Sequence, residues 1–391
     1  MGTEIWMTRK RMFCSYLYGY LNTYYANRIL SQCSDGTYKR EKVRLAGNYL
    51  KLSGKSLSLF TASFGLWSCA ENVLYIFIVT YYLLKVLLTK VRRNKSQQVN
   101  KAKDIFVYGY GAWNLFTLIK KTEINIDDVV VITYPCRDNS SYDQRRRFDL
   151  SQDLTVAEIF QAYGCALRMI FFIKHKYGSR DALFHTSNSF EYFSVYLFYL
   201  KHPDYKICFV DLYDRWAYMF GSLKNYKILI QHGMITRGSL FIKKTGDVDE
   251  CYAFSEEQKE ILLETLIKTI KICRYLPKLS LYTLSDTQSG RRTLLIICSH
   301  FFYDKEKQIV EKLSLSKKWD LYLKPHPLDD IAPYTTLAST YNAVLVGKEE
   351  FPKVDLAISY ASTLALEYQI AGVKVLQYND SDFEEELQKL Y

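Results

Sequence analysis

The sequence predicts an α/β fold in which the strands of parallel sheets alternate with crossover helices, and two observations predict it. Between residues 320 and 378, short apolar runs rich in β-branched and aromatic residues alternate with helix-like segments. These runs are Leu321–Leu323, Val344–Val346, Leu356–Ser359 and Val373–Leu376. Polar clusters directly follow two of the runs, and the carboxyl ends of strands are where ligands collect in open α/β sheets.

An earlier set of alternating segments begins at Asp104 and predicts another α/β half. The strand candidates there are Val129–Thr133, Ala182–His185, Ile207–Leu212, Lys227–Gln231 and Cys251–Phe254. Glu256–Thr269 is typical of an amphipathic helix with Ser255 as its N-cap. The later half starts with the run Thr293–Ser299, after the polar segment Ser285–Arg292. We therefore predict a basic, aromatic N-terminal region over residues 1–103 and two domains over residues 104–285 and 286–391.

The composition favours a globular, basic protein of a reducing compartment. Its 391 residues carry a formal net charge of +11, which indicates an anionic partner such as a phosphorylated substrate or an acidic membrane surface. The sequence has no zinc-finger spacing, glycine-flanked aromatic RNA-binding strand or basic heptad region, so we expect no nucleic-acid partner. The nine cysteines include no CxxC pair, which argues against a disulfide framework and against a zinc site.

One apolar stretch, Val73–Val91, is a candidate membrane segment. Its 19 residues are long enough to span a bilayer, and Lys85 lies near one end, where its stem can snorkel. A basic cluster at its C-terminal end would be cytoplasmic by the positive-inside rule. The cluster comprises Lys90, Arg92, Arg93, Lys95, Lys101 and Lys103. The segment is therefore expected at the cytoplasmic face of a membrane, as a spanning or surface-bound helix, and the alternative is a buried helix of a soluble protein.

Two polar clusters near the C-terminus are candidate ligand sites. Lys324 and His326 directly follow one predicted strand. Ser359, Ser362 and Thr363 lie between another predicted strand and the helix after it. Hydroxyls and free N–H groups at the positive end of a helix make a natural seat for a phosphate. The structural alternative is that the prolines beside His326 only end a strand and the hydroxyls only cap a helix.

A third cluster, Gln231-His232-Gly233, directly follows a predicted strand of the earlier half. Gly233 permits a sharp turn, and His232 would project at the carboxyl edge of that sheet, toward a cleft between the halves. A neutral imidazole there can accept a proton from an acceptor hydroxyl. The alternatives are a ring that only bonds the loop backbone, and a base supplied instead by Asp211 or Asp214.

Another histidine, His300, follows the strand-like run that ends at Ser299 and is expected to line the same cleft. No DxD-like acidic motif lies at a strand end, because Asp329 and Asp330 fall in the loop beyond the histidine-proline motif.

The order of these motifs resembles that of the GT-B glycosyltransferase superfamily. The sequence QHG, then LKPHP, then SYASTLALE is similar to motifs of bacterial capsule and lipooligosaccharide sialyl- and polysialyltransferases and of teichoic-acid glycerophosphotransferases. The resemblance extends over residues 104–391 by layout and is carried by short motifs. It implies two Rossmann-like domains that face a cleft, the first binding an acceptor and the second a nucleotide-sugar donor.

The resemblance also implies a set of donor-binding residues at or just after strand ends. They are Lys324 and His326 for the donor phosphate, Ser359, Ser362 and Thr363 for the same phosphate or the ribose, and Glu367 of the same motif. The chain departs from the sialyltransferase pattern at Gln231-His232-Gly233, where those enzymes have an acidic pair before glycine and the glycerophosphotransferases have His-Gly. It departs again where Tyr360 and Ala361 split the serine motif.

These observations and the resemblance together predict a membrane-associated glycosyltransferase, and the resemblance implies that it needs no metal ion and no cofactor. It would move a sugar from a nucleotide-activated donor, with a CMP-sialic acid-like or other cytidine-linked donor favoured, to a surface polysaccharide or glycolipid acceptor. His232 would deprotonate the acceptor while the strand-end residues of the later half stabilise the leaving phosphate. The alternatives are a nucleotide-sugar epimerase of the same architecture and a non-catalytic scaffold or export protein of the polysaccharide machinery.

Overall fold

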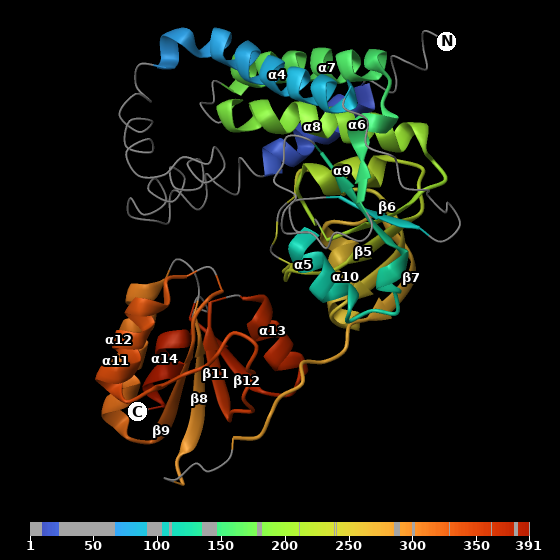
Figure 1. Cartoon of the computed structure of the whole chain (residues 1–391). Helices are drawn as coiled ribbons and strands as arrows, with labels where there is room; N and C mark the ends of the chain where they lie inside the picture. The colour runs from blue at the N-terminus through green and yellow to red at the C-terminus, as the bar shows by residue number, and fades with distance from the viewer. Residues whose placement is uncertain are drawn as a thin grey trace. The chain divides into compact units, whose positions relative to one another are not determined.

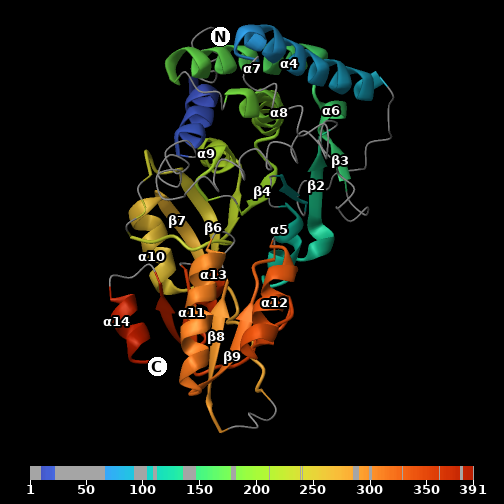
Figure 2. The ribbon, with the colours of Figure 1, turned by 90° about the vertical axis from the view of Figure 1, so that its left-hand side faces the viewer.

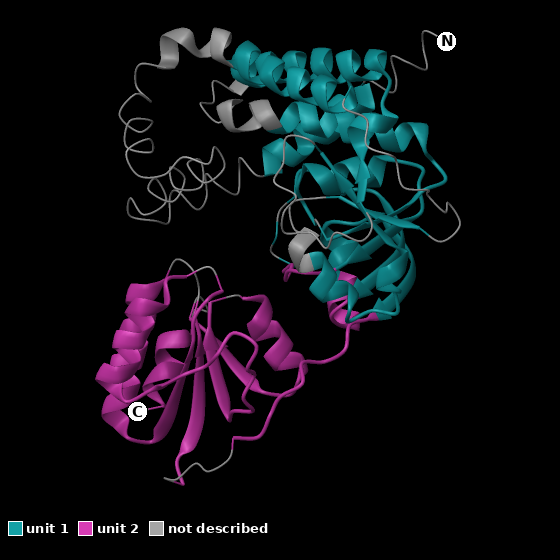
Figure 3. Cartoon of the chain, in the orientation of Figure 1, with its two compact units in different colours: residues 1–230, 237–252, 261–274 teal, residues 231–236, 253–260, 275–391 magenta. Residues whose placement is uncertain are grey.

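The protein is described by a computed structural model that divides into two compact units. The described residues are 10–22, 67–91, 104–108, 112–134, 147–177, 182–210, 212–237, 239, 241–284, 290–298, 302–327, 329–360, 362–378 and 382–390. Figure 3 colours the first unit (residues 1–230, 237–252 and 261–274) teal and the second (residues 231–236, 253–260 and 275–391) magenta. The loop that carries Gln231-His232-Gly233 therefore belongs to the second unit.

The first unit contains a seven-stranded sheet in the order β3-β2-β1-β4-β5-β6-β7 (Figure 1). The strands are β1 (Ile105–Val107), β2 (Val129–Thr133), β3 (Arg147–Asp149), β4 (Lys206–Phe209), β5 (Lys227–Ile230), β6 (Asp247–Ala253) and β7 (Thr269–Tyr275). The pairings from β3 across to β6 are all parallel. The predicted parallel sheet is therefore present, and its strand order reverses between β1 and β4.

Helices connect these strands, and some of them form a separate layer beyond the sheet. They comprise a helix over residues 10–22, α4 (Trp67–Val91), α5 (Ala112–Ile119), a 3-10 turn (Ile126–Asp128), α6 (Leu150–Asp153), α7 (Val156–Tyr177), α8 (Ala182–Lys201), α9 (Arg215–Ser222) and α10 (Glu256–Thr265). Figures 1 and 2 both show α4, α7 and α8 side by side in this layer, and all three helices contact one another. Ser255 caps α10 as predicted, since its Oγ accepts from the Gln258 N–H at 3.2 Å.

The strand predicted over Ala182–His185 is wrong, because these residues begin the 20-residue helix α8. Every residue of α8 from Asn188 to Tyr199 is buried. This buried part includes polar residues such as Asn188 and Glu191, and it follows the segment Ala182–His185 that is predicted as a strand. That four-residue segment spans only about one helical turn, too short to show a 3.6-residue period, and its aromatic Phe184 is typical of strands.

The edge strand β7 (Thr269–Tyr275) was not predicted. The helix expected to reach Thr269 ends at Thr265, and the chain then enters the strand. Most of β7 is exposed, and it carries Lys271 and Arg274, which make ion pairs with Asp249 and Glu250. Charged side chains are common on exposed edge strands, where they oppose further strand addition. They also obscure the alternating pattern by which a strand is recognised.

The second unit contains a five-stranded parallel sheet in the order β10-β9-β8-β11-β12. The strands are β8 (Arg292–Ile297), β9 (Trp319–Lys324), β10 (Val344–Leu345), β11 (Leu356–Ser359) and β12 (Lys374–Gln377). The helices are α11 (Tyr303–Ser316), α12 (Ile331–Tyr341), α13 (Thr363–Ile370) and α14 (Phe383–Gln388). All five predicted strands are confirmed, and the strand order reverses between β8 and β11.

Alternation along the strands divides the core of the second unit into two layers. Leu294 and Ile296 of β8 point to the face that α11, α12 and α14 cover. Leu295 and Ile297 point to the opposite face, where Ala365 and other residues of α13 pack. Because helices cover both faces of the sheet, the strand sequences are continuous apolar runs and do not alternate between apolar and polar residues. The chain is thus built from two parallel-sheet α/β units.

Candidate functional site

The place where strand order reverses in the second sheet is the expected ligand position of an open α/β unit. It lies between the carboxyl ends of β8 and β11, where Ser359 pairs in register with Ile297. Ser359 is fully buried, and its hydroxyl donates to the Ile297 carbonyl at 3.0 Å. Its side chain therefore ties the two strands together at the reversal point.

Ser362 continues this connection into helix α13. Its Oγ accepts the Ala365 N–H at 3.1 Å, which makes it the N-cap of the helix, and lies 3.0 Å from the Ser359 Oγ. Because the Ser359 proton is already donated to Ile297, the Ser362 hydroxyl is the donor between the two serines. Both serine hydroxyls are thus used to fix the start of α13, as the structural interpretation of the motif predicted.

The groups at the start of α13 that remain available to bind a ligand are mainly backbone groups. The N–H groups of Thr363 and Leu364 have no acceptor within the helix, because the first turn of any helix lacks preceding carbonyls. The Thr363 Oγ1 accepts the Met234 N–H at 3.3 Å and keeps its own proton. The helix start therefore combines N–H donors, a hydroxyl donor and the positive end of the helix dipole.

The contact between Met234 and Thr363 brings together two motifs that lie 129 residues apart in the sequence. Gln231 holds the first of these motifs in place. Its buried side-chain amide donates to the Gly233 carbonyl at 3.0 Å and to Gln258 Oε1 at 2.8 Å, and its Oε1 accepts the Phe254 N–H at 3.1 Å. Gln231 is therefore a positioning residue for the loop.

His232 lies on the surface of this fixed loop and is exposed. It lies two positions before Met234, so their Cα atoms are within about 7 Å of each other. Asp211 and His300 lie outside the described residues. Asp214, the other acidic candidate, is the N-cap of α9, where its Oδ1 accepts from Trp216 N at 2.8 Å and Ala217 N at 3.2 Å. This capping role is a sufficient reason for an aspartate at position 214, and no catalytic role is needed to explain it.

Lys324 ends β9 with its side chain turned into the protein. The buried ammonium donates to the carbonyls of Gly347, Lys348 and Glu350 at 2.7, 3.0 and 2.8 Å, and lies 4.6 Å from the centre of the Phe351 ring. Burial lowers the pKa of Lys324, and the nearby Glu349 and Glu350 carboxylates act in the opposite direction. All three ammonium protons are used on the loop after β10, so we leave Lys324 out of the proposed ligand set.

Replacing Lys324 with methionine is expected to lower the free energy of unfolding by about 2–4 kcal/mol, because three carbonyls lose their donor. Urea unfolding measures this. The control is Lys353→Met, since Lys353 is exposed in the same part of the chain and should change stability by less than about 0.5 kcal/mol. A Lys324→Met protein with normal stability and weak nucleotide binding would return Lys324 to the ligand set.

His326 and Glu367, the remaining predicted donor-binding residues, are both half-buried. The His326 carbonyl accepts the Asp329 N–H at 2.9 Å, so the histidine-proline motif forms a tight turn beyond β9. Because β9 and β11 lie on either side of β8, this turn follows a strand about 10 Å, two strand spacings, from β11. Glu367 lies in the second turn of α13.

Sequence reasoning missed a buried carboxylate at the same edge of the sheet. Glu306 on α11 is fully buried, and its two oxygens accept from Tyr334 at 3.0 Å and Tyr378 at 3.1 Å. Burial, and next the charge of Glu306, raise the pKa of both tyrosine hydroxyls. The tyrosines therefore remain protonated donors to Glu306, and the network joins α11, α12 and the end of β12.

Three aromatic rings beside this network were also missed. Phe302, Tyr360 and Tyr378 follow β8, β11 and β12, and their ring centres are 4.1 Å apart for Phe302 and Tyr360 and 5.3 Å for Tyr360 and Tyr378. Tyr378 is fixed beside the serines, since its N–H donates to the Ser359 carbonyl at 3.0 Å. The signal that could have revealed them is an aromatic residue just after each of three parallel strands.

The fold and the site define an open α/β protein whose second sheet presents a helix N-terminus, hydroxyls and aromatic rings at its reversal point. Within the described part of the chain, no group of three or more His, Cys, Asp and Glu side chains could hold a metal ion. No protein-family model and no curated protein matches the sequence. A solved structure of the wall teichoic acid polymerase TagF is similar, with a TM-score of 0.36 and 9% sequence identity, and the match covers 80% of each chain.

Proposed function

We propose that the chain is a glycosyltransferase that binds a nucleotide-activated sugar at the start of α13. The observation that carries the proposal is the Met234–Thr363 contact, which joins the QHG loop to that helix start within one unit. A candidate base and a candidate phosphate seat are thereby held in one place, as transfer of a sugar from a phosphate leaving group requires.

The donor phosphate is assigned to the N-terminus of α13. The Thr363 and Leu364 N–H groups, the Thr363 hydroxyl and the helix dipole would stabilise the negative charge that develops on the leaving phosphate. His326 would add a further donor from the turn beyond β9. Phe302 and Tyr360 offer ring faces on which a nucleobase or sugar can stack.

The acceptor hydroxyl is assigned to His232, which would remove its proton as a general base. His232 is exposed, and the Gln231 bonds fix the loop beneath it, so the imidazole can meet a substrate while its backbone stays in place. On the resemblance of the motifs, we propose a cytidine-linked donor and a surface polysaccharide or glycolipid acceptor, with a reaction of the GT-B type that needs no metal ion.

The experiment that tests this function measures nucleotide binding and product formation. Thermal shift with CMP, CDP, UDP and GDP should stabilise the protein with a cytidine nucleotide most strongly. Incubation with the matching sugar nucleotide should then release the nucleotide only when a glycan acceptor is present. Binding of none of the nucleotides would favour the scaffold alternative. Conversion of the donor sugar without an acceptor would favour the epimerase.

Replacing His326 with alanine is expected to weaken donor binding by about tenfold, because one hydrogen bond to a charged phosphate is lost. Isothermal titration with the nucleotide found above measures the change. His232→Ala serves as the control, since the proposed base contacts the acceptor and its loss should leave nucleotide affinity unchanged. Equal affinity of wild type and His326→Ala would remove His326 from the donor site.

A further inference from the structure

We propose that α4 and α7 form a face that docks the protein onto an anionic lipid bilayer, with both helices lying in the plane of the membrane. The feature that points to this is a continuous apolar surface on α4, which we name the α4 outer stripe. Its members and their exposed fractions are Ile76 (43%), Phe77 (70%), Tyr81 (55%), Leu84 (54%), Leu88 (59%) and Val91 (81%). From Phe77 onward they recur every three or four residues, so they share one side of the helix.

The opposite side of α4 is part of the first unit's core. Tyr75, Val79 and Val86 are fully buried, and Thr80 Oγ1 lies 2.9 Å from the Tyr163 hydroxyl of α7. One helix thus has one apolar side packed on protein and another apolar side uncovered by the described residues. A helix packed lengthwise on its own domain cannot cross a bilayer alone, so contact with lipid has to take place along its outer side.

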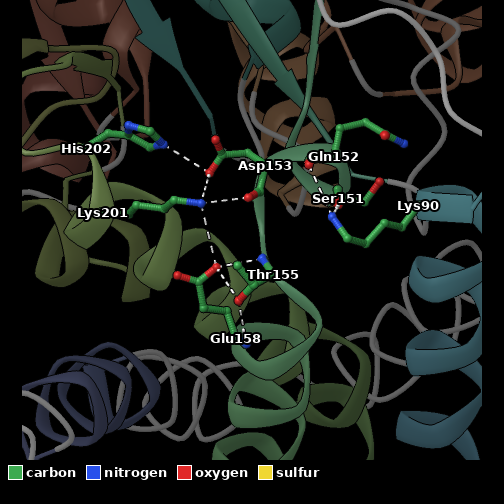
Figure 4. A network of polar contacts seen from close by, with 8 residues as sticks. All are labelled: Lys90, Ser151, Gln152, Asp153, Thr155, Glu158, Lys201 and His202. Carbon is green, nitrogen blue, oxygen red and sulfur yellow. Dashed lines mark hydrogen bonds and ion pairs between the residues drawn. The ribbon is translucent and has the colours of Figure 1, made fainter.

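Polar contacts also fasten the C-terminal end of α4 to the unit (Figure 4). Lys90 donates to the Ser151 and Gln152 carbonyls at 3.3 and 3.2 Å, and the Gln152 side chain donates back to the Thr89 carbonyl at 3.0 Å. In the same network Lys201 lies 3.2 Å from Asp153. The helix is therefore held at this end as well as along its inner side.

Helix α7 packs beside α4 and carries further exposed apolar residues. It runs antiparallel to α4, since Lys174 near its end lies 5.5 Å from the Tyr75 ring while residues just before α7 contact Lys90. Val156, Phe160 and Phe172 of α7 are 50%, 51% and 40% exposed. Among the described helices, α7 is also the one that is long and apolar enough to cross a membrane, and the qualifying stretch is Val156–Lys176. It nevertheless packs against α4 and α8.

The charges favour an anionic bilayer over another protein surface. From Asn72 to Lys103 the sequence contains seven Lys and Arg residues and no Asp or Glu. Of these seven residues only Lys85 and Lys90 are described, and Lys90 is bound to the Ser151 and Gln152 carbonyls. Exposed Arg168 and Lys176 add positive charge on α7. Two copies paired through these helices would bring the exposed cations of α7 together, which charge repulsion opposes. An acidic membrane surface instead attracts each cation and takes up the apolar side chains.

The test is flotation of the full chain with sealed vesicles of 70% phosphatidylcholine and 30% phosphatidylglycerol. The triple variant F77S/L84S/L88S should lower the partition coefficient by at least about tenfold, because three large apolar side chains no longer insert. The matched control is L315S/I331S/V344S, which removes three apolar side chains exposed elsewhere, by 78%, 57% and 53%, and should bind like wild type. Equal binding of all three proteins would overturn the proposal.

Two further measurements separate the proposed arrangement from its rivals. Protein bound to donor vesicles should move to empty acceptor vesicles within minutes, because a helix lying in the surface dissociates, whereas a spanning helix would stay behind. Wild type and F77S/L84S/L88S should sediment with the same mass in the absence of vesicles. A lower mass for the variant would show that the stripe binds a second copy of the chain, and this too would overturn the proposal.

Discussion

Replacing His232 with alanine is expected to lower turnover by about 10²–10⁴-fold, the usual contribution of a general base. The reason is the position of His232 on the loop that Met234 joins to Thr363, beside the proposed phosphate seat. Initial rates at saturating donor and acceptor measure the effect, and titration with the nucleotide should give unchanged affinity.

The control for this experiment is His175→Ala, since His175 is exposed on α7 in the first unit and should leave turnover unchanged. A histidine held only for structure gives a different result. In that case the His232→Ala protein would be less stable while its turnover per folded molecule stayed normal. The base would then be sought at Asp211, the candidate that follows β4.

Replacing Glu306 with alanine is expected to lower the free energy of unfolding by about 3 kcal/mol, because the Tyr378 hydroxyl loses its acceptor, the Tyr334 hydroxyl keeps only Asp329 at 3.2 Å, and a cavity forms. Urea unfolding measures the change. Glu306→Gln should cost less, since its amide oxygen can still accept from one tyrosine.

Glu311→Ala is the matched control, because Glu311 is exposed on the same helix and should change stability by less than about 0.5 kcal/mol. The network interpretation fails if Glu306→Ala and Glu311→Ala are equally stable. If Glu306→Ala is destabilised and also binds nucleotide weakly, the network supports the site as well as the fold.

The strands of the second unit could be predicted from sequence because each is a short apolar run bounded by polar residues, as Leu356–Ser359 shows. The start of α8 could not, because Ala182–His185 spans only about one helical turn and is too short to show the periodicity that distinguishes a helix from a strand. The start of α13 was predictable for the same reason as the strands: Ser362 is a local signal, and the residue that it caps lies three positions away.

The remaining site residues depend on contacts that local sequence does not reveal. Glu306 has the pattern of an ordinary charged residue in an amphipathic helix, and its partners Tyr334 and Tyr378 lie 28 and 72 residues later. Lys324 beside a histidine-proline motif resembles a phosphate ligand, yet its acceptors are carbonyls 23 to 26 residues away. In both cases the fold, and not the neighbouring sequence, decides what the charge binds.

The amide of Gln231 has a thermodynamic consequence for substrate binding. It bonds to Gly233, Phe254 and Gln258, so the loop that carries His232 is ordered in the folded protein before any ligand arrives. Ordering a flexible loop on binding would cost about 1–2 kcal/mol of conformational entropy for each residue fixed. Folding has already removed the conformational freedom of this loop. A substrate that contacts His232 therefore does not spend interaction energy on ordering it, and that energy contributes to binding affinity or to a lower activation barrier.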